Sequence, residues 1–532
     1  MNPILKNKFY LYFTEFFAGM SVMAVELGAS RLLAPYFSSS QIVWTIIIGT
    51  IMIAMALGNL YGGRAADKNP DPDKLYGRIL IAAIWIAAIP AVGKYIIVAI
   101  SGLLIFTVDS NFLVIAGFAS CMLIFVFPLF LLGTVTPSLV KYTVDSLDDS
   151  GSVVGKLNAA NTIGSIIGTF VPTFVSIPAV GTSVTFLIFA GVLLALCLIY
   201  FGFKSKAVIK SVVGVIIFIT CCVLGHDTSF AFWQSDLTYE GESVYNYLQV
   251  YETDKKVVLS TNVLFGTQSV YQKEKGPTGF YYDHAMASVY MGKPDEDRKE
   301  KILILGNGSG TFATQCNRYF DDLDITGVEI DEKITELAGE YFGLDKDIPV
   351  VTYDGRAYLN VSKDKYDVIM VDAYQDITIP FQMSGTEFFE LVADHLTENG
   401  VMVVNLNMRS ETPGNINEYL CDTIASVFPY VYTADVQGCT NRELYASFDD
   451  VMIEKFKVAL MHEDDEDLIY MMSKVDDVLT GYEGGDLIFT DDKAAVELLG
   501  MQVIDELIKD EVEYYREIFD KEGIKGLIER FG

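Results

Sequence analysis

The first 225 residues contain about seven apolar runs that are each long enough to cross a lipid bilayer as a helix. A hydrocarbon core about 30 Å thick requires roughly 20 consecutive apolar residues. The first run follows Lys6 and Lys8 without a convincing cleavage site, which indicates a membrane span and not a removed signal peptide. We therefore expect a multi-pass protein of the cell membrane that contacts the lipid bilayer. The runs cover residues 9–32, 41–63, 79–100, 111–134, 158–178, 182–202 and 207–224.

Charge divides the chain at the same point. Residues 1–225 carry 13 Lys/Arg and 9 Asp/Glu, a net charge of +4, whereas residues 226–532 carry 25 Lys/Arg and 60 Asp/Glu, a net charge of −35. The acidic half repels nucleic acid, so we expect no nucleic-acid partner. Its surface would attract cationic small molecules, or would serve solubility alone.

The loops of the first half predict an orientation. Lys and Arg gather after the second, fourth and sixth runs, and the positive-inside rule places these loops in the cytoplasm. Seven spans would put the acidic half on the opposite side of the membrane. If the short last run, 207–224, lies at the interface, six spans would return the acidic half to the cytoplasm. The sequence leaves both arrangements open.

Three charged residues lie in or beside the first span. Glu15, Glu26 and Arg31 are costly in lipid and must face a polar interior, one another or the interface. These residues predict one of two arrangements. Either they line a path for a cation, or they form an internal ion pair while a charged side chain at the helix end extends to the membrane interface. Glycines at four-residue spacing, Gly58/Gly62 and Gly164/Gly168, indicate close helix packing.

The seven cysteines are scattered without a C-x-x-C pair, and the four histidines show no metal-binding spacing. We expect no metal site. Residues 226–295 are predicted to form a small unit, because residues 243–272 alternate apolar and polar side chains as antiparallel hairpins do. Residues 296–532 are predicted to form a third domain.

The third domain begins with a strand, a glycine-rich loop and a helix. Residues 301–305 (KILIL) are a continuous apolar run typical of a buried parallel strand. The loop that follows carries Gly306, Gly308 and Gly310, which allow backbone N–H groups to approach a ligand at the helix start. Thr311 stands where a dinucleotide-binding loop would have its last glycine, which favours an adenosyl-sulfonium ligand over a nicotinamide dinucleotide.

Acidic residues end the strands after this loop. Strands are predicted at 324–330, 349–353, 366–371 and 401–406, with a helix at about 386–396. Alternation of strand and helix predicts a doubly wound α/β domain of the Rossmann-like, methyltransferase type, which binds ligands at the carboxyl ends of its strands. Glu329 would accept hydrogen bonds from ribose hydroxyls there, and Asp354 and Asp372 end the next two strands.

The order and spacing of these motifs resemble the polyamine aminopropyltransferases, the spermidine synthase family, and in particular its membrane-fused bacterial relatives. The similarity spans roughly residues 243–430. It rests on S-V-Y-N-Y, F-Y-Y-D-H-A-M at 280–286, I-L-G-N-G-S-G at 304–310, V-E-I-D at 328–331, D-G-R-A-Y-L at 354–359, V-D-A-Y-Q-D at 371–376 and P-F-Q-M-S-G-T-E-F-F at 380–389.

The resemblance implies a transfer of an aminopropyl group from decarboxylated S-adenosylmethionine to a diamine or polyamine such as putrescine. Asp372 would accept the proton of the attacking amine. Residues 374–385 would form a lid over the amine. The cofactor-binding residues would be Gln268, Gly306, Gly308, Gly310, Glu329, Asp354, Gly355 and Pro380, and the substrate-binding residues Tyr282, Asp283, Ser309, Tyr374, Gln375 and Asp376.

Two positions depart from the family pattern. Members that use a diamine usually carry an aspartate in the glycine loop, where this chain has Ser309. The second aspartate of the family's D-x-x-D is Gln375 without a gap, whereas a one-residue insertion restores Asp376 and its distance to Pro380. Losing one amine anchor weakens the case for putrescine and leaves the adenosyl site intact.

Two other functions stay open. A methyltransferase that uses ordinary S-adenosylmethionine has the same fold, and a transporter or sensor could use the adenosyl domain for regulation. A segment near the carboxyl end, T-D-D-K-A-A-V-E at 490–497, resembles the fused relatives, and we expect a helix cap there. If the protein forms oligomers, we expect a homodimer.

Overall fold

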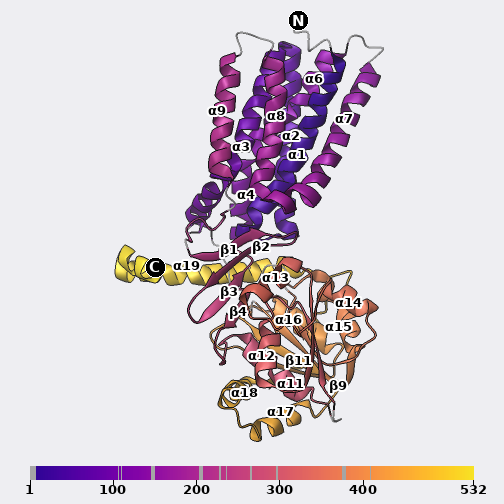
Figure 1. The fold of residues 1–532 in the computed structure, drawn as a ribbon, viewed down its shortest axis with the longest axis vertical. Helices are drawn as coiled ribbons and strands as arrows, with labels where there is room; N and C mark the ends of the chain where they lie inside the picture. The colour runs from indigo at the N-terminus through magenta and orange to yellow at the C-terminus, as the bar shows by residue number, and fades with distance from the viewer. Residues whose placement is uncertain are drawn as a thin grey trace. The chain divides into compact units, whose positions relative to one another are not determined.

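The computed structural model describes residues 7–105, 107–108, 111–144, 150–202, 208–226, 229–234, 236–263, 267–294, 298–373, 379–407 and 409–531 (Figure 1). The chain folds into two compact units. The first comprises residues 1–234 and 240–247, and the second comprises residues 235–239 and 248–532.

The first unit is helical, and within its described residues six helices are long and apolar enough to cross a membrane. One of the six is a 52-residue stretch, Ser150–Phe201, that contains two of the expected spans. The helices are α1 (Lys8–Phe37), α2 (Gln41–Lys68), α3 (Pro72–Leu104), α4 (Phe112–Ile124), α5 (Val126–Gly133), α6 (Val135–Thr143), α7 (Ser150–Val171), α8 (Ile177–Phe201) and α9 (Val208–Gly225).

Two expected spans differ from the helices that form. The run at 111–134 is broken between α4 and α5 at Phe125, and the second of these helices continues almost directly into α6. A five-residue π-helix, Pro172–Ser176, joins α7 to α8, and Gly181 near the start of α8 has a left-handed φ of 78°. Pro172 and Gly181 are residue types that interrupt regular helical hydrogen bonding.

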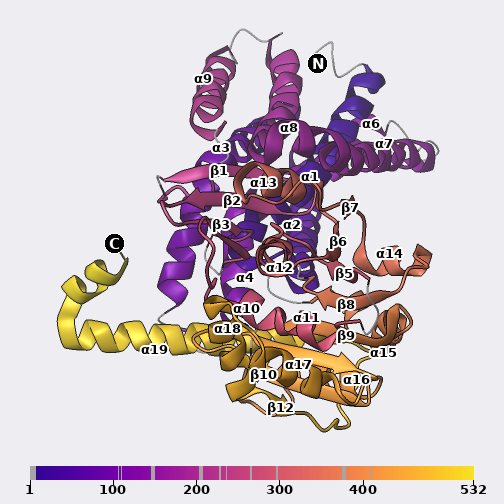
Figure 2. The same ribbon diagram turned by 60° about the horizontal axis from the view of Figure 1, so that its bottom comes forward.

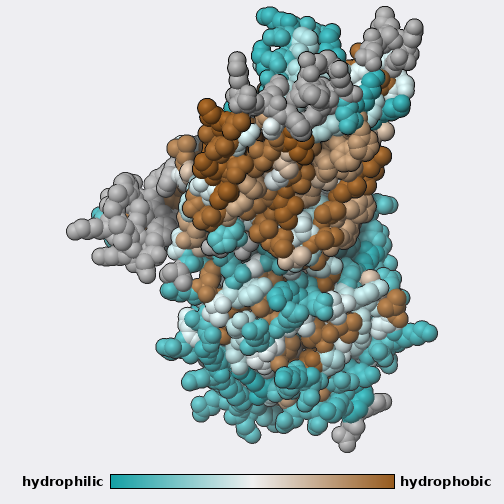
Figure 3. Space-filling model, turned by 45° about the horizontal axis from the view of Figure 1, so that its top comes forward, coloured by the Kyte–Doolittle hydropathy of each residue, from teal (hydrophilic) through white to brown (hydrophobic). Residues whose placement is uncertain are grey.

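Apolar side chains cover much of the face of these helices that Figure 3 shows. Met52 is 65% exposed, Phe174 69% and Ile209 76%. A soluble protein rarely exposes a large contiguous apolar patch, whereas a hydrocarbon environment requires one.

The interior of the helical unit is closely packed around small and polar residues. A Cβ on Gly164 would lie 2.0 Å from the carbonyl oxygen of Phe16, so α7 can approach α1 this closely only with glycine. The buried Glu15 accepts hydrogen bonds through Oε1 from Thr136 (2.5 Å) and Asn161 (2.8 Å). Arg31 donates to the backbone carbonyls of Ser243 and Val244.

A small sheet precedes the α/β domain. Its strand order is β1 (Leu237–Glu242), β2 (Tyr247–Glu252), β3 (Lys256–Ser260) and β4 (Ser269–Gln272), and the pairs β2/β3 and β3/β4 are antiparallel as the alternating pattern predicts. Val250, Val257 and Leu259 of this sheet pack with Leu337 and Phe342 in one apolar cluster.

The α/β domain is built on an eight-stranded sheet of order β12-β10-β11-β9-β8-β5-β6-β7, with helices on both faces (Figure 2). Its parallel strands are β5 (Glu300–Leu305), β6 (Leu323–Glu329), β7 (Val350–Thr352), β8 (Tyr366–Val371) and β9 (Leu396–Leu406). The helices between them are α12 (Thr311–Tyr319), α13 (Glu332–Tyr341), α14 (Gly355–Val361) and α15 (Thr386–Ala393). This is the Rossmann-like, methyltransferase-type topology that the sequence predicts.

The carboxyl ends of β5, β6 and β8 meet at one edge of this sheet. Leu305 pairs with Val328 on one side and with Val371 on the other. The residues that come directly after these three paired positions, Gly306, Glu329 and Asp372, are therefore brought together. The strand at β9 begins at Leu396, earlier than expected, because α15 already ends at Ala393.

An antiparallel extension completes the sheet beyond β9. It comprises β11 (Arg442–Ser447), β10 (Tyr430–Asp435) and β12 (Thr480–Gly481). The remaining helices are α10 (Tyr281–Ala285), α11 (Ala287–Met291), α16 (Ile416–Ala425), α17 (Met452–Met461), α18 (Glu466–Val478) and α19 (Val496–Phe531).

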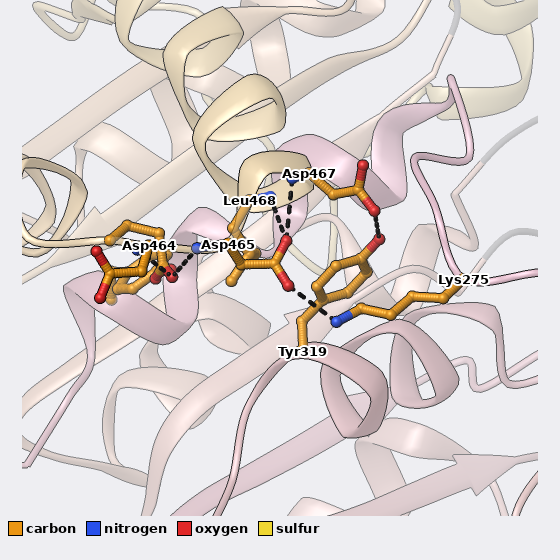
Figure 4. Close-up of polar contacts among 8 residues, drawn as sticks. Lys275, Tyr319, Asp464, Asp465, Asp467 and Leu468 are labelled. Atoms are coloured by element: carbon orange, nitrogen blue, oxygen red, sulfur yellow. Dashed lines mark hydrogen bonds and ion pairs between the residues drawn. The ribbon is translucent and has the colours of Figure 1, made fainter.

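Polar contacts join the start of α18 to α12 and to the chain before α10 (Figure 4). Asp465 caps α18 by accepting from the N–H groups of Asp467 and Leu468, and it also pairs with Lys275 at 2.9 Å. Tyr319 of α12 donates to Asp467 at 3.0 Å, and the Lys275 ammonium lies 4.3 Å from its ring centroid.

Candidate active site

The glycine loop after β5 adopts a backbone that favours glycine. Gly306, Gly308 and Gly310 have φ values of 86°, 53° and 78°. A Cβ on Gly306 would lie 2.5 Å from the carbonyl oxygen of Asp372, so this position also allows the two strand ends to approach each other. The backbone of the loop therefore lies directly against the residues that follow β8.

Glu329, at the end of β6, fixes the glycine loop from the other side. Its Oε2 accepts from the N–H of Gly308 at 2.8 Å, and its Oε1 accepts from the N–H of Asp331 at 3.0 Å. Burial raises the pKa of Glu329, and the two N–H donors oppose this rise. The carboxylate thus lies at the loop, where the sequence predicts a nucleoside to bind.

Asp372 follows β8 directly and is held on both carboxylate oxygens. Tyr281 donates to Oδ2 at 2.6 Å, and Asn405 Nδ2 donates to Oδ1 at 2.8 Å. The Asn405 amide is itself oriented by Asn441, whose Nδ2 donates to Asn405 Oδ1 at 2.8 Å. The carboxylate is therefore fixed by residues from α10, β9 and the chain before β11.

Asp372 keeps some accessible surface but is densely surrounded by protein. Burial raises the pKa of Asp372 to about 7, and the negative charge of Glu329 adds to the rise. The hydrogen bonds from Tyr281 and Asn405 act in the opposite direction. A carboxyl group with a pKa near neutrality can accept a proton during a reaction and release it afterwards.

Several other predicted residues line the same region. Tyr282 stacks beside Tyr281, with ring centroids 4.1 Å apart, and donates to the carbonyl of Gln268 at 3.2 Å. Ser309 is buried, and its hydroxyl lies 3.1 Å from that of Thr311. The structure thus brings β4, the glycine loop and α10 together.

Four predicted residues have local structural roles. Asp283 accepts from the N–H and hydroxyl of Thr278 and from the N–H of Gly279. Asp354 caps α14 by accepting from the N–H of Ala357 at 2.8 Å, and Gly355 begins that helix. Pro380 precedes a short 3₁₀ turn, Phe381–Met383.

The segment after Pro380 is held by the chain near the carboxyl end. Arg356 of α14 forms a two-bond ion pair with Asp491, both bonds at 2.6 Å, and also donates to the carbonyl of Gln382 at 2.8 Å. The N–H of Thr386 donates to the carbonyl of Phe489 at 3.0 Å. Asp491 therefore pairs across to α14, and the segment 490–497, where the sequence predicts a helix cap, leads into α19 at Val496.

Three predicted substrate-binding residues, Tyr374, Gln375 and Asp376, lie outside the described residues. The structure therefore does not bear on the choice between Gln375 and Asp376. Within the described ranges, no group of three or more His, Cys, Asp or Glu side chains could hold a metal ion.

Four polar residues of the site were not singled out as site residues from the sequence: Tyr281, Asn405, Asn441 and Glu443. Asn405 interrupts the apolar run of its strand, which is a detectable signal. Glu443 precedes Leu444, Tyr445 and Ala446 in its strand, but only the pairing of β11 with β9 shows that it lies opposite Asn405.

Comparison with known proteins identifies a family for part of the chain. Residues 280–439, which contain Tyr281, the glycine loop and Asp372, match the spermine/spermidine synthase domain. A solved spermidine synthase in complex with the transition state analogue AdoDATO is 20% identical, with a TM-score of 0.38 over 45% of this chain and 85% of that one.

Two relatives are similar over most of their own length. A probable polyamine aminopropyl transferase of Bifidobacterium longum is 51% identical over 349 residues, which cover 62% of this chain and 77% of the relative. A polyamine aminopropyltransferase of Vibrio vulnificus is 26% identical over 41% of this chain and 73% of its own length. The chain therefore belongs to the spermine/spermidine synthase family of polyamine aminopropyltransferases, and it is a transferase.

Proposed function

We propose that this protein is a membrane-anchored aminopropyltransferase that moves an aminopropyl group from decarboxylated S-adenosylmethionine to a diamine such as putrescine. The observation that carries the proposal is the Asp372 carboxylate, held by Tyr281 and Asn405 beside the glycine loop. Family membership favours aminopropyl transfer over methyl transfer by the same fold.

The proposed reaction is a nucleophilic substitution at carbon. The amine nitrogen attacks the methylene group beside the sulfonium, the carbon–sulfur bond breaks, and methylthioadenosine leaves with that electron pair. The attacking nitrogen must lose a proton, and Asp372 is positioned to accept it. Its carboxylate would also orient the ammonium before attack, and alignment of the two substrates supplies much of the rate gain.

The glycine loop and Glu329 would bind the nucleoside part of the donor. Glu329 accepts from the N–H of Gly308, and its carboxylate oxygens can also accept from ribose hydroxyls. Gln268, Asp354, Gly355 and Pro380 would complete the donor site. Tyr282, Asp283 and Ser309, with Tyr374, Gln375 and Asp376, would line the amine site.

The exposed apolar helices support the membrane anchor. Alkaline carbonate washing of cell membranes tests it, because an integral protein stays in the pellet and a peripheral one is released. Release of the full-length chain into the wash would contradict the anchor and would leave the chemistry untouched.

The chemistry is tested on the purified full-length protein in detergent. Supplied with decarboxylated S-adenosylmethionine and putrescine, it should release methylthioadenosine at a rate that depends on the amine concentration. Tight binding of ordinary S-adenosylmethionine, with no release from the decarboxylated donor for any of several amines, would contradict the proposal.

A further inference from the structure

The helical unit contains a buried carboxyl group that aminopropyl transfer does not use. Glu15 lies on α1, outside the α/β domain, and its side chain is 0% exposed. It comes after Lys8, the first residue of α1, by a distance of about 10 Å along the helix. An ionisable side chain at this depth in a membrane-spanning bundle is costly, which makes it a candidate for a function of its own.

Both contacts of Glu15 fall on one of its two carboxyl oxygens. Thr136 Oγ1 of α6 donates to Oε1 at 2.5 Å, and Asn161 Nδ2 of α7 donates to the same oxygen at 2.8 Å. The other oxygen, Oε2, is buried and has no hydrogen-bond partner within the described residues. A protonated carboxyl group uses its oxygens in this unequal way, because the carbonyl oxygen accepts while the other oxygen carries the hydrogen.

Among the residues that the structure describes, no cation pairs with Glu15. Arg78 of α3 donates to a serine hydroxyl of α6 at 3.3 Å, and Lys141 of α6 pairs with Asp67 of α2 at 2.9 Å. Lys156 of α7 is exposed, and α8 carries no Lys, Arg, Asp or Glu. An isolated buried carboxylate is strongly unfavourable, so a bound proton is the compensation that this surrounding allows.

The titratable phenol groups near α1 have other partners. Tyr76 of α3 shares a hydrogen bond of 2.9 Å with Thr14, and its ring stacks on those of Tyr10 and Tyr200. Tyr200 of α8 donates to Asp73 at the start of α3. These phenols form a separate polar cluster, and none of them bonds to Oε2 of the buried acid.

The two donors to Glu15 come from interrupted helices. Thr136 is the second residue of α6, directly after the break from α5, and α7, which carries Asn161, runs into the π-helix Pro172–Ser176. Interrupted helices supply ion sites in membrane transporters, and π-helical turns are frequent at functional sites. A Cβ on Gly19 would lie 2.6 Å from the carbonyl oxygen of Asn161, so α1 and α7 touch beside the carboxyl group. A change of charge there would act on the packing of three helices.

We propose that Glu15 is a proton-binding site of the helical unit, which takes a proton from water and returns it as the packing of α6 and α7 on α1 changes. The inference goes beyond aminopropyl transfer, whose proposed residues all lie outside this unit. It gives the helical unit a proton-dependent function in addition to anchoring. The membrane setting comes from the proposed function, and carbonate washing tests that setting separately.

Infrared difference spectroscopy of the full-length protein in lipid vesicles tests the site. Spectra between about pH 4 and pH 9 show the C=O stretch of each carboxyl group that is protonated. Subtracting the Glu15→Gln series from the wild-type series removes the bands that other carboxyl groups and lipid esters contribute to both. We expect a single C=O band to remain and to be lost as the pH rises. Absence of this band, or a band that does not change with pH, overturns the inference.

Glu26→Gln is the matched control. Glu26 lies on the same helix but is partly exposed. This variant should keep the band assigned to Glu15 with the same pH dependence. If Glu26→Gln removes the band as completely as Glu15→Gln does, the band reports the fold of the helical unit and the inference fails.

Thr136→Val covers the case in which Glu15→Gln does not fold. It removes one donor to Oε1, so the C=O band should move to higher frequency, because a carbonyl bond strengthens when it loses a hydrogen bond. Thr143→Val removes a hydroxyl of the same helix that donates to the carbonyl of Leu139 at 2.7 Å, and it should leave the band in place. A band that is unmoved in both variants does not arise from Glu15, which refutes the site. Release of the protein by carbonate would instead refute the membrane anchor.

Discussion

Tyr281 donates a 2.6 Å hydrogen bond to Asp372, from a helix that lies 91 residues earlier in the sequence. The phenol and the Asn405 amide each bind one oxygen of the carboxylate, and both favour its charged form. Burial favours the neutral form. The balance between these effects sets the protonation state of the proposed proton acceptor near neutral pH.

The first prediction concerns the pH dependence of the reaction. Activity should rise with pH as Asp372 loses its proton, with an acid limb of kcat/KM near pH 7. Tyr281→Phe removes a donor to the carboxylate, so the limb should move upward by about one pH unit. Initial rates between about pH 5 and 9 measure this shift.

Tyr482→Phe is the matched control for that measurement. Tyr482 also donates a 2.6 Å hydrogen bond to a carboxylate, that of Asp422, away from the candidate site. The control should leave the acid limb in place. An equal shift in both variants would show that the acid limb of the pH profile does not reflect the loss of a proton by Asp372.

The second prediction concerns stability. The pKa of Asp372 is about 7 in the folded protein and about 4 in an unfolded chain. Between these values the folded state holds a proton that the unfolded state has lost, so this residue destabilises the fold increasingly as pH rises. The stability of Asp372→Asn relative to the wild type should therefore increase by about 2–3 kcal/mol as the pH rises from about 5 to about 8. Urea unfolding of the α/β domain within the intact chain measures the difference; a pH-independent difference would contradict the assigned pKa.

The third prediction concerns the contact between Arg356 and Asp491. Both side chains are partly exposed, so Asp491→Asn should cost less than about 1 kcal/mol of stability. The substitution should mainly increase local opening of the backbone around Thr386, because the N–H of Thr386 donates to the carbonyl of Phe489, two residues before Asp491. We expect faster hydrogen exchange at Thr386, measured by mass spectrometry. Asp465→Asn breaks a comparable ion pair with Lys275 and should leave Thr386 unchanged.

The fourth prediction concerns the helical unit. Gly164→Ala would place a Cβ 2.0 Å from the Phe16 carbonyl oxygen, so it should destabilise the packing of α7 on α1 by about 1–3 kcal/mol. Gly155→Ala lies on the same helix with no atom within 4 Å of the added Cβ, and it should be neutral or slightly stabilising. Thermal unfolding in detergent compares them. Equal effects would contradict the close packing of α1 and α7.

Much of the α/β core follows from local pattern. The strand Tyr366–Val371 is the predicted one, because a continuous apolar run bounded by polar residues has few alternatives. The acids at the strand ends follow from the same reasoning, since parallel strands end at one edge. The break between α4 and α5 and the π-helix at Pro172–Ser176 depend on packing within the bundle, which hydropathy does not encode.

The residues that complete the site depend on long-range pairing. Tyr281 reaches Asp372 only because α10 packs against β9 and β11, and Glu443 lies opposite Asn405 only through the register of the antiparallel extension. Sequence periodicity predicts neither a register nor a partner strand. Asp283 and Asp354 are also predicted site residues, but their carboxylates accept from nearby backbone N–H groups.

The most direct test of the account compares binding with turnover in Asp372→Asn. The full-length variant should bind methylthioadenosine with the affinity of the wild type, measured by calorimetry, because the glycine loop and Glu329 are unchanged. Its rate of methylthioadenosine release with putrescine should fall by about 100-fold or more. Turnover equal to that of the wild type would contradict the role of Asp372 as the proton acceptor.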